Sequence, residues 1–504
     1  MSAVALQQLL PQLTGTKIGG VLVHGVAIDS RQLRRGELFI ALNGHRGHGL
    51  HYLPQVIERG AAALLYEPTS APVELCRTYD GAIPMLAIAD LAQQISQIAA
   101  RFFHHPGRTL HLTAVTGTNG KSSVAHLYAT ALEGCGEREC GLMGTLGAGR
   151  PQRLSYNGMT TPDAVSVQRQ LAQWRSEALS YAMMEVSSHA LDQDRVAAVP
   201  FTTAIFTNLS RDHLDYHGTL ARYGAAKAKL FQFESLQQAI INIADPFGRQ
   251  LIAQLPRSVT GYGYQLLRQG ERPDPLAAIT GEIVAADRSG MTLKVATPWG
   301  EGQWRLPLLG EHNGENLLAV VAALRLAGLS WESLPRRLQA AHLPAGRVER
   351  LTTPTGVEVV IDFAHTPDGL QSLLQALKQH QFGRIWLVFG CGGDRDRGKR
   401  PQMGRVAESA SESVIVTSDN PRSESPQAII DDIIAGMAAP ERAVSIVDRA
   451  EAIEYALREA APGECVVIAG KGHEQGQIVG TQTLPFSDQQ WVMCYLQQQQ
   501  EQAA

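Results

Sequence analysis

Short apolar runs alternate with polar, glycine-containing segments through most of this chain, and helical patterns lie between them. From about residue 109 onward, the order of strand, turn and helix repeats, which is typical of a parallel α/β architecture. Each apolar run has the length of a buried strand and ends in polar or glycine-rich sequence. The clearest predicted strands are 110–116, 181–186, 203–207, 357–363, 385–389, 414–417 and 465–469.

The length of the chain predicts several domains. With 504 residues it is too long for one hydrophobic core, and about 150 residues per domain suggests roughly three. We place the domains at 1–95, 96–342 and 343–504. Because ligands of parallel sheets bind outside the carboxyl ends of the strands, function is expected in the polar segments that follow the predicted strands.

Composition narrows the class of partner. Lys+Arg 44 against Asp+Glu 48 gives a net charge of -4, so no basic field points to nucleic acid or to an anionic membrane, and small molecules are the expected partners. The N-terminal segment lacks a positive region before its short apolar stretch, and no run of about 18 apolar residues occurs. We therefore expect a cytoplasmic monomer without a membrane span. Its six cysteines form no CxxC pair, which argues against structural zinc or a disulfide framework.

The strongest local signal is the segment Thr116–Ser123, TGTNGKSS, called the phosphate loop below. It follows a predicted strand and opens a helix that ends at Gly134. Glycines let backbone N–H groups surround phosphate oxygens, Lys121 can reach the outer phosphates, and Ser122 can ligate Mg²⁺. Only two residues separate Gly117 from Gly120, whereas the common loop has four. A glycine-rich turn without a nucleotide is the alternative.

TGTNGKSS resembles the ATP loop of the Mur ligases and of their relatives, the folylpolyglutamate synthetases, which join an amino acid to a carboxylate using ATP. Further segments resemble that family in order, from about residue 25 to about 490: Met184–His189, Asn208–Gly218, Gly310–Asn316 and Asp362–Pro367. The resemblance implies an α/β protein of three domains: a smaller α/β N-terminal domain, a central P-loop-type ATPase-like domain with a parallel sheet, and a Rossmann-like C-terminal domain. It implies ATP binding by Gly117, Thr118, Asn119, Gly120, Lys121, Ser122, Ser123, Asn313, Asn316, Arg347 and Asp362.

A predicted helix at 219–231 contains two lysines on different faces. At 100° per residue, Lys227 shares a face with four apolar or aromatic residues, whereas Lys229 lies opposite. The other members of that face are Leu220, Tyr223, Leu230 and Phe231. Lys227 is therefore expected to point toward the core, where a lysine can also simply extend its ammonium to water.

The resemblance gives Lys227 another role, because the matching lysine of Mur ligases is carbamylated by CO₂. A carbamate replaces a cation with anionic oxygen, which suits Mg²⁺. Glu185 and His213, which we place just beyond predicted strands, are turn residues on their own; with the phosphate loop they become candidate metal ligands. The implied catalytic residues are Lys121, Glu185, His213 and carbamylated Lys227 (N6-carboxylysine), and the implied Mg²⁺ ligands are Ser122, Glu185, His213 and Lys227.

The N-terminal segment resembles the uridine-nucleotide-binding domain of one branch of the family, a domain that folate-adding relatives do not need. Without this resemblance, Ser30 would be assigned to a polar turn, and residues 45–47 to a flexible loop. The positions that match contacts to the UDP-muramoyl-dipeptide are Ile28, Ser30, His45, Arg46, Gly47, Thr160, Thr161, Ser187, Gln193 and Arg195.

Three predicted strand ends in the last domain contain polar side chains. The segment SDNPR at 418–422 reads alone as an ordinary strand-to-helix turn. Together with the other two ends, it fits an amino acid with a second zwitterionic end, since guanidinium groups match carboxylates and carboxylates accept from ammonium. In the family, DNPR is associated with meso-diaminopimelate, and lysine-adding members usually differ there. The implied diaminopimelate-binding residues are Arg395, Asp419, Asn420, Pro421, Arg422, Gly470 and Glu474.

The expected function is ATP-dependent ligation of meso-2,6-diaminopimelate to the D-glutamate of UDP-MurNAc-L-Ala-D-Glu through an acyl phosphate, in peptidoglycan and cell-wall synthesis. ATP is a co-substrate and Mg²⁺ the expected cofactor. The alternatives are the same reaction with L-lysine, a folylpolyglutamate synthetase-like ligase, a nucleotide switch that controls partner binding, and an inactive relative used as a scaffold.

Overall fold

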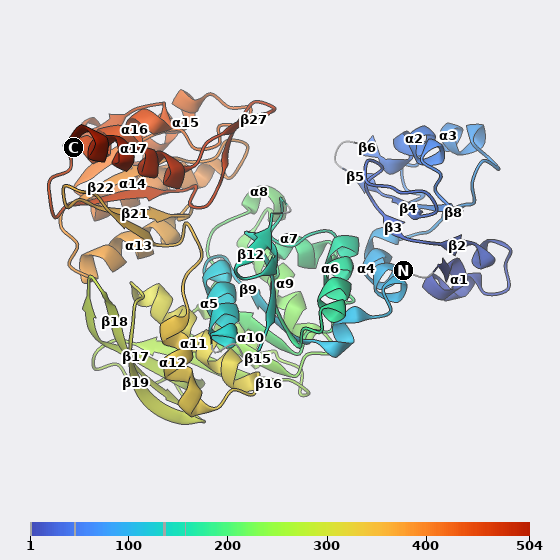
Figure 1. The fold of residues 1–504 in the computed structure, drawn as a ribbon, viewed down its shortest axis with the longest axis horizontal. Coiled ribbons are helices and arrows are strands. Elements are labelled where there is room, and N and C mark those ends of the chain that lie inside the picture. The colour runs from blue at the N-terminus through green and yellow to red at the C-terminus, as the bar shows by residue number, and fades with distance from the viewer. Residues whose placement is uncertain (1–2, 45–46, 135–137, 157, 504) are drawn as a thin grey trace. The chain divides into compact units, whose positions relative to one another are not determined.

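The computed structural model describes residues 3–44, 47–134, 138–156 and 158–503 (Figure 1). It divides into two compact units. The first unit comprises Met1–Ala114, Arg138–Thr202 and Lys229–Leu236, and the second comprises Val115–Glu137, Thr203–Ala228 and Gln237–Ala504. No helix of the described residues has the length and apolar character needed to cross a membrane. The three-domain boundaries stay a prediction, and residue 95 lies inside the helix α4 (Leu91–Phe102).

The N-terminal part of the first unit is a small parallel sheet with helices on both faces. Its strands are β3 (Val26–Ala27), β4 (Leu38–Ala41), β7 (Ala63–Tyr66) and β8 (Met85–Ala87). Side chains alternate between the faces, as the period of a strand requires. Ile40 packs with α1 (Leu6–Leu9) and α4, whereas Phe39 packs with α2 (Leu53–Glu58).

The rest of the first unit contains the segments expected to bind the muramoyl-dipeptide. Strand β10 (Cys140–Gly144) pairs in parallel with β13 (Tyr181–Glu185) and antiparallel with β11 (Gly147–Arg150), which pairs in turn with β12 (Arg153–Ser155). Two helices lie on either side of β13 in the sequence: α6 (Ala164–Ser176) precedes it and α7 (Ser188–Asp192) follows it. Glu185 is the last residue of β13, whereas we expected it to lie just beyond the strand.

The phosphate loop belongs to the second unit and connects β9 (His111–Thr116) to α5 (Lys121–Glu133), as predicted. Strands β14 (Thr203–Phe206), β15 (Gln238–Asn242), β16 (Thr260–Leu267) and β17 (Ala277–Asp287) are parallel neighbours. An antiparallel meander through β18 (Gly290–Thr297) and β19 (Gly300–Leu306) follows, which the sequence pattern did not predict. Helix α11 (Glu311–Leu326) packs against α5 and β16.

The predicted helix 219–231 is shorter than expected. Helix α9 ends at Ala228 after beginning at Leu220, and a 3₁₀ turn continues over Lys229–Gln232. Tyr223, Lys227, Leu230 and Phe231 are buried as predicted. The prediction for Leu220 was wrong, because it occupies the first position of α9 and its side chain is 45% exposed.

The C-terminal sheet has the order β20-β21-β25-β22-β23-β24, and all its neighbours except β20 and β21 are parallel. The strands are β20 (Glu349–Thr352), β21 (Glu358–Asp362), β22 (Ile385–Phe389), β23 (Ser413–Val416), β24 (Ala443–Ser445) and β25 (Cys465–Ala469). Because β25, β22 and β23 are neighbours, the three polar strand ends predicted from the sequence meet along one edge. The hairpin of β26 (Gly476–Val479) and β27 (Gln482–Pro485) follows β25.

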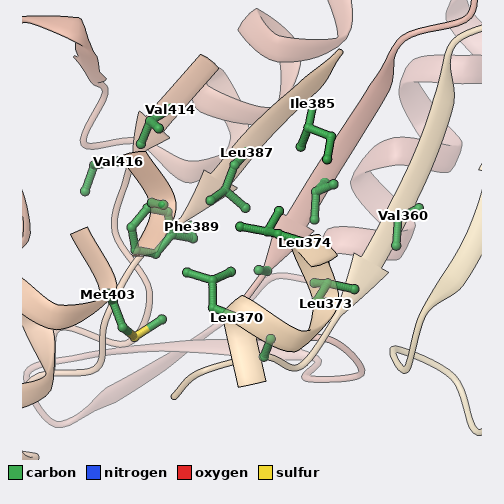
Figure 2. Packing of buried hydrophobic residues seen from close by; sticks show 14 of the residues in the cluster. Val360, Leu370, Leu373, Leu374, Ile385, Leu387, Phe389, Met403, Val414 and Val416 are labelled. Carbon is green, nitrogen blue, oxygen red and sulfur yellow. The ribbon is translucent and has the colours of Figure 1, made fainter. Parts of the chain in front are cut away.

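Side-chain alternation buries both faces of this sheet. Leu387, Phe389 and Val414 pack on α13 (Pro367–Gln379), α14 (Arg400–Ala410) and α15 (Pro426–Ile434), as Figure 2 shows for part of the cluster. Val388 and Ile415 pack on α16 (Arg449–Glu459) and α17 (Asp488–Ala503). This two-sided core holds the strand ends in a fixed order.

The remaining helices of the structure are short connections. They are α3 (Val73–Thr78), α8 (Leu214–His217), α10 (Pro246–Ala253) and α12 (Leu334–Ala340).

Candidate active site

The phosphate loop is attached to the end of β14. Gly117 has φ +152°, and a Cβ there would lie 1.9 Å from Thr207 Oγ1, so the position requires glycine. Thr207 Oγ1 donates to the carbonyl of Asn119 at 2.6 Å, and the Asn119 N–H donates to Asn208 Oδ1 at 2.9 Å. These bonds fix the loop ahead of the N-terminus of α5, where backbone N–H groups favour an anion.

Two cations lie at this helix start. Lys121 Nζ donates to the carbonyls of Gly117 and Thr118 at 3.0 and 2.8 Å. Arg347 Nη2 donates to Ser122 Oγ at 3.4 Å, although the two residues are far apart in the sequence. The loop therefore combines a helix N-terminus, a hydroxyl and two positive charges, which suits a polyphosphate.

A cavity of about 300 Å³ opens beside the loop in the second unit. Seven of the residues predicted to bind ATP line it: Asn119, Gly120, Ser123, Asn313, Asn316, Arg347 and Asp362. Other lining residues were not predicted from the sequence, among them the polar or titratable side chains Asp245, Tyr264, His312 and Glu315. His312 and Glu315 lie in the quoted segment Gly310–Asn316, so the helical spacing of α11 could have indicated them.

The polar groups of this cavity are held in defined orientations. Asn316 Nδ2 donates to Asn313 Oδ1 at 3.2 Å, and Asn313 Nδ2 donates to the Leu309 carbonyl at 2.9 Å. Asp362 accepts from the N–H groups of Val348 and Ala364, both at 2.8 Å. Burial raises the pKa of Asp362, while the charge of Arg347 opposes that rise. Burial, together with the carboxylates of Glu311 and Asp245, raises the pKa of Glu315 to about 7.

Lys227 is fully enclosed next to the phosphate loop. Its Nζ donates to the Gly117 carbonyl at 2.7 Å and lies 4.2 Å from the ring centroid of Tyr223. Burial, and then the charge of Lys121, lower the pKa of Lys227 well below its usual value. The shift is toward the neutral amine, which is the form that reacts with CO₂.

His213 is the N-cap residue that precedes α8, with φ +52°, and it follows Asp212 directly. His213 Nε2 and His365 Nε2 lie 3.4 and 3.5 Å from the same oxygen, Asp212 Oδ2. Burial would raise the pKa of Asp212, but the two histidines, His365 foremost, hold it well below its usual value. Asp212 thus links His213 to His365, which lies between β21 and α13.

The residues predicted to bind the muramoyl-dipeptide gather around β13 in the first unit. Thr161 Oγ1 donates to the Glu185 carbonyl at 2.8 Å and accepts from the Ser187 N–H at 3.0 Å. Arg195 Nη1 donates to the Thr161 carbonyl at 2.9 Å, and its Nη2 donates to Gln193 Oε1 at 2.6 Å.

Thr145 connects two more of these groups. Its hydroxyl lies 3.0 Å from Thr160 Oγ1, and its N–H donates to Glu185 Oε1 at 3.0 Å. In the N-terminal sheet, Ile28 is half-buried, Ser30 is buried and Gly47 is exposed. His45 and Arg46 lie outside the described residues.

The three strand ends of the C-terminal sheet form what we call the polar rim: Gly392–Arg395, Asp419–Arg422 and Gly470–Glu474. Arg422 has φ +52°, and its Nη1 donates to the Gly393 carbonyl at 2.8 Å. Asn420 Nδ2 donates to Glu474 Oε2 at 2.8 Å. Gly470 has φ +113°, and a Cβ there would lie 2.8 Å from Asp419 Oδ2, so glycine permits the close approach. The rim brings together the residues predicted for diaminopimelate, including Pro421.

The charges of the rim are paired unevenly. Burial, and then the guanidinium of Arg395, lower the pKa of Arg422. Two guanidinium groups therefore face one region, which favours a carboxylate ligand. Asp419 lies at the same rim with a lowered pKa, because Lys471 and Arg449 outweigh the effect of burial.

The phosphate-loop side and the polar rim adjoin within the second unit. Arg211 donates to both oxygens of Asp396, at 2.8 and 3.0 Å, and Asp396 follows Arg395 directly. Asn119 Nδ2 donates to Thr366 Oγ1 at 3.4 Å, so the loop also contacts the N-terminus of α13. A larger cavity of about 470 Å³ in the first unit is lined by none of the predicted site residues.

Three parts of the chain match Mur ligase families. Residues 22–107 match the Mur ligase family, catalytic domain; residues 115–324 match the Mur ligase middle domain; and residues 346–472 match the Mur ligase, glutamate ligase domain. A solved folylpolyglutamate synthase from Mycobacterium tuberculosis, 21% identical with a TM-score of 0.60 over 75% of this chain and 92% of its own, shares the fold.

Relatives named UDP-N-acetylmuramoyl-L-alanyl-D-glutamate–2,6-diaminopimelate ligase cover nearly the whole chain. The protein of Alkalilimnicola ehrlichii is 44% identical over 490 residues, 96% of this chain and 97% of its own. That of Ectopseudomonas mendocina is 45% identical over 490 residues, 96% of each chain. A solved structure with the same name is 33% identical, with a TM-score of 0.69 over 99% of this chain and 100% of its own. The expected three-domain α/β fold is confirmed, and the chain belongs to the Mur ligase family.

Proposed function

We propose that this protein is an ATP-dependent ligase that joins meso-2,6-diaminopimelate to the D-glutamyl carboxylate of UDP-MurNAc-L-Ala-D-Glu, a step of peptidoglycan synthesis in the cytoplasm. The observation that carries the proposal is the Arg211–Asp396 pair, which connects the segment beside the phosphate loop to the polar rim. A nucleotide site and a site for a zwitterionic amino acid then adjoin, as amide ligation requires. The names of the full-length relatives support the choice of substrates.

The chemistry begins with an activated carboxylate, because a free carboxylate is a poor electrophile toward an amine. Transfer of the γ-phosphate of ATP would give an acyl phosphate with a good leaving group, and the amine would attack that carbonyl. In this scheme Lys121 and Arg347 offset the charge that develops on the transferred phosphoryl group. Asn313, Asn316 and Asp362 would hold the nucleotide in the cavity, and closure of that cavity would exclude water.

The side chains proposed to hold Mg²⁺ suit the ion in part; Ser122, His213 and Lys227 belong to the second unit and Glu185 to the first. Ser122 supplies a hard oxygen, whereas Lys227 would supply one only as a carbamate, which its low pKa favours. Glu185 offers a carboxylate and His213 an imidazole, a less usual partner for this ion. The described residues contain no group of three or more His, Cys, Asp or Glu side chains arranged for a metal. When bound, Mg²⁺ would neutralise phosphate charge.

At the polar rim, Arg395 and Arg422 would bind a carboxylate of diaminopimelate, and Asp419, Asn420 and Glu474 would surround an ammonium. In the first unit, the network of Thr160, Thr161, Ser187, Gln193 and Arg195 would bind the peptide portion of the acceptor. The UDP portion would lie against the N-terminal sheet near Ser30. Domains at 1–95, 96–342 and 343–504 remain part of the proposal.

The test is phosphate release from ATP in the presence of UDP-MurNAc-L-Ala-D-Glu, with meso-diaminopimelate, L-lysine or no amino acid. We expect release with meso-diaminopimelate and formation of the tripeptide product. Preference for L-lysine would assign the rim to another amino acid. Release without any amino acid would favour a nucleotide switch over a ligase.

A further inference from the structure

Lys471 is a completely buried cation inside the polar rim, two residues after β25. Its exposed fraction is 0%, and its Nζ donates to Glu474 Oε2 at 2.7 Å, to the Gly476 carbonyl at 2.7 Å and to Asn420 Oδ1 at 3.3 Å. An ammonium has three donors, so all three are used. The lysine is therefore held at one point, and two of its three acceptors are side chains expected to contact the amino acid.

These bonds determine the orientation of Asn420. Its Oδ1 accepts from Lys471 and from the Ile478 N–H, the latter at 2.9 Å. Its Nδ2 donates to Glu474 Oε2 at 2.8 Å. The amide cannot turn over without losing contacts at both ends, because Oδ1 and Nδ2 have opposite hydrogen-bonding roles.

The same bonds divide the two oxygens of Glu474. Oε2 accepts from both Lys471 and Asn420, whereas Oε1 has no hydrogen bond to any part of the chain that the structure describes. The Glu474 side chain is 33% exposed while that of Lys471 is 0% exposed, so the carboxylate reaches outward from a buried anchor. One oxygen is fixed and the other remains available to a ligand.

Lys471 also balances the charge of the rim. Asp419 is buried and directly precedes Asn420, and Glu474 adds a second carboxylate to the same rim. Two carboxylates in one enclosed site disfavour each other's ionised form unless a cation lies between them. Burial would raise the pKa of Asp419, but the charge of Lys471 helps to lower it, which favours the carboxylate that a site for an ammonium group needs.

We propose that Lys471 is a positioning residue for the incoming amino acid, holding Glu474 and Asn420 so that Glu474 Oε1 accepts a hydrogen bond from the substrate ammonium. This inference rests on the proposed function and deepens it. Lys471 acts through Glu474 and Asn420 without itself touching the substrate, since its three donors are already engaged. Its loss should weaken capture of the amino acid and leave the nucleotide site intact.

The test is steady-state kinetics of Lys471→Met, which keeps most of the length of the side chain and removes the charge. We expect the KM for meso-diaminopimelate to rise roughly 10- to 100-fold, as for the loss of charged hydrogen bonds, with the KM for ATP unchanged and kcat altered much less. Lys378→Met is the matched control, because Lys378 forms a surface pair with Glu412 at 3.5 Å in the same domain. That control should behave as wild type.

A double-mutant cycle separates positioning from a general structural role. If Lys471 acts through Glu474, then Lys471→Met combined with Glu474→Gln should raise the KM no further than the larger single change. Additive effects, an unchanged KM for the amino acid, or a parallel loss of kcat and of affinity for all substrates would overturn the inference. Should Lys471→Met not fold, Lys471→Arg keeps the cation but cannot reproduce the three bonds, and must still raise that KM. Wild-type activity with meso-diaminopimelate tests the proposed function independently.

Discussion

Lys227 Nζ lies 2.7 Å from the carbonyl oxygen of Gly117, so a lysine of α9 is bonded to the first glycine of the phosphate loop. The lysine and the loop are separated by more than one hundred residues. Their contact arises because the loop lies beside the end of β14, and because the buried face of α9 packs toward the loop. A substitution of Lys227 should therefore affect the phosphate loop, where ATP is expected to bind.

We expect Lys227→Ala to lose activity by about 100-fold or more, as for removal of a group that stabilises a transition state. If the working form is a carbamate, formate, acetate or bicarbonate should restore part of the rate by supplying the missing carboxylate. Lys229→Ala, at an exposed position on the next turn, is the control. Full activity of Lys227→Ala would exclude the carbamate. A carbamate carbon resonance in wild-type protein supplied with ¹³C-bicarbonate would identify it directly.

Arg347→Ala should lower turnover far more than stability. Arg347 contacts Ser122 and lies 4.6 Å from the ring centroid of Phe363, a cation–π contact worth about 1–2 kcal/mol. We expect kcat to fall about 100-fold or more, because a charge near the transferred phosphoryl group is lost. Arg384→Ala removes a comparable contact, 5.2 Å from the Trp386 ring, and should spare kcat. Equal losses of turnover and stability in Arg347→Ala would contradict a role in closure.

Glu315→Gln should change how stability depends on pH. The pKa of Glu315 is raised to about 7 in the folded protein, so the unfolded chain loses this proton first as the pH rises. Wild-type protein therefore loses stability between about pH 4.5 and pH 7, by about 1–3 kcal/mol. Glu315→Gln should become more stable than wild type over that window. Urea unfolding at pH 5 and pH 8 measures the difference, with Glu332→Gln at an exposed position as the control; parallel profiles of Glu315→Gln and wild type would refute the assignment.

The Arg449–Asp488 pair should be the most sensitive ion pair of the C-terminal sheet domain. Its two hydrogen bonds measure 2.7 and 2.8 Å, and both side chains are completely buried. Arg449→Met should destabilise the protein by about 3–5 kcal/mol, because it leaves Asp488 as an unpaired buried charge. Arg449→Met combined with Asp488→Leu should cost less than Arg449→Met alone. Thermal and urea unfolding of both variants would test this, and equal losses would contradict it.

The sequence by itself determined the phosphate loop, the seven strands and the polar segments that end them. Those features depend on local properties: glycine conformations, the two-residue period of strands, and the helix that begins at Lys121. It also determined the buried face of α9 apart from Leu220. The prediction for Leu220 was wrong because a periodic pattern does not show where along a helix the packing ends. The antiparallel meander of β17, β18 and β19 escaped notice, since strands whose alternate residues face solvent give weaker apolar runs.

Only the tertiary structure decided which polar ends meet. The order β25-β22-β23 places Arg395, Asn420 and Glu474 on one rim, although they are distant along the chain. The packing of distant segments also places Glu315 in the cavity beside the phosphate loop, and it buries Lys471 within the polar rim. Local sequence fixes what a residue can do chemically, whereas packing determines which partners, charges and degree of burial it meets.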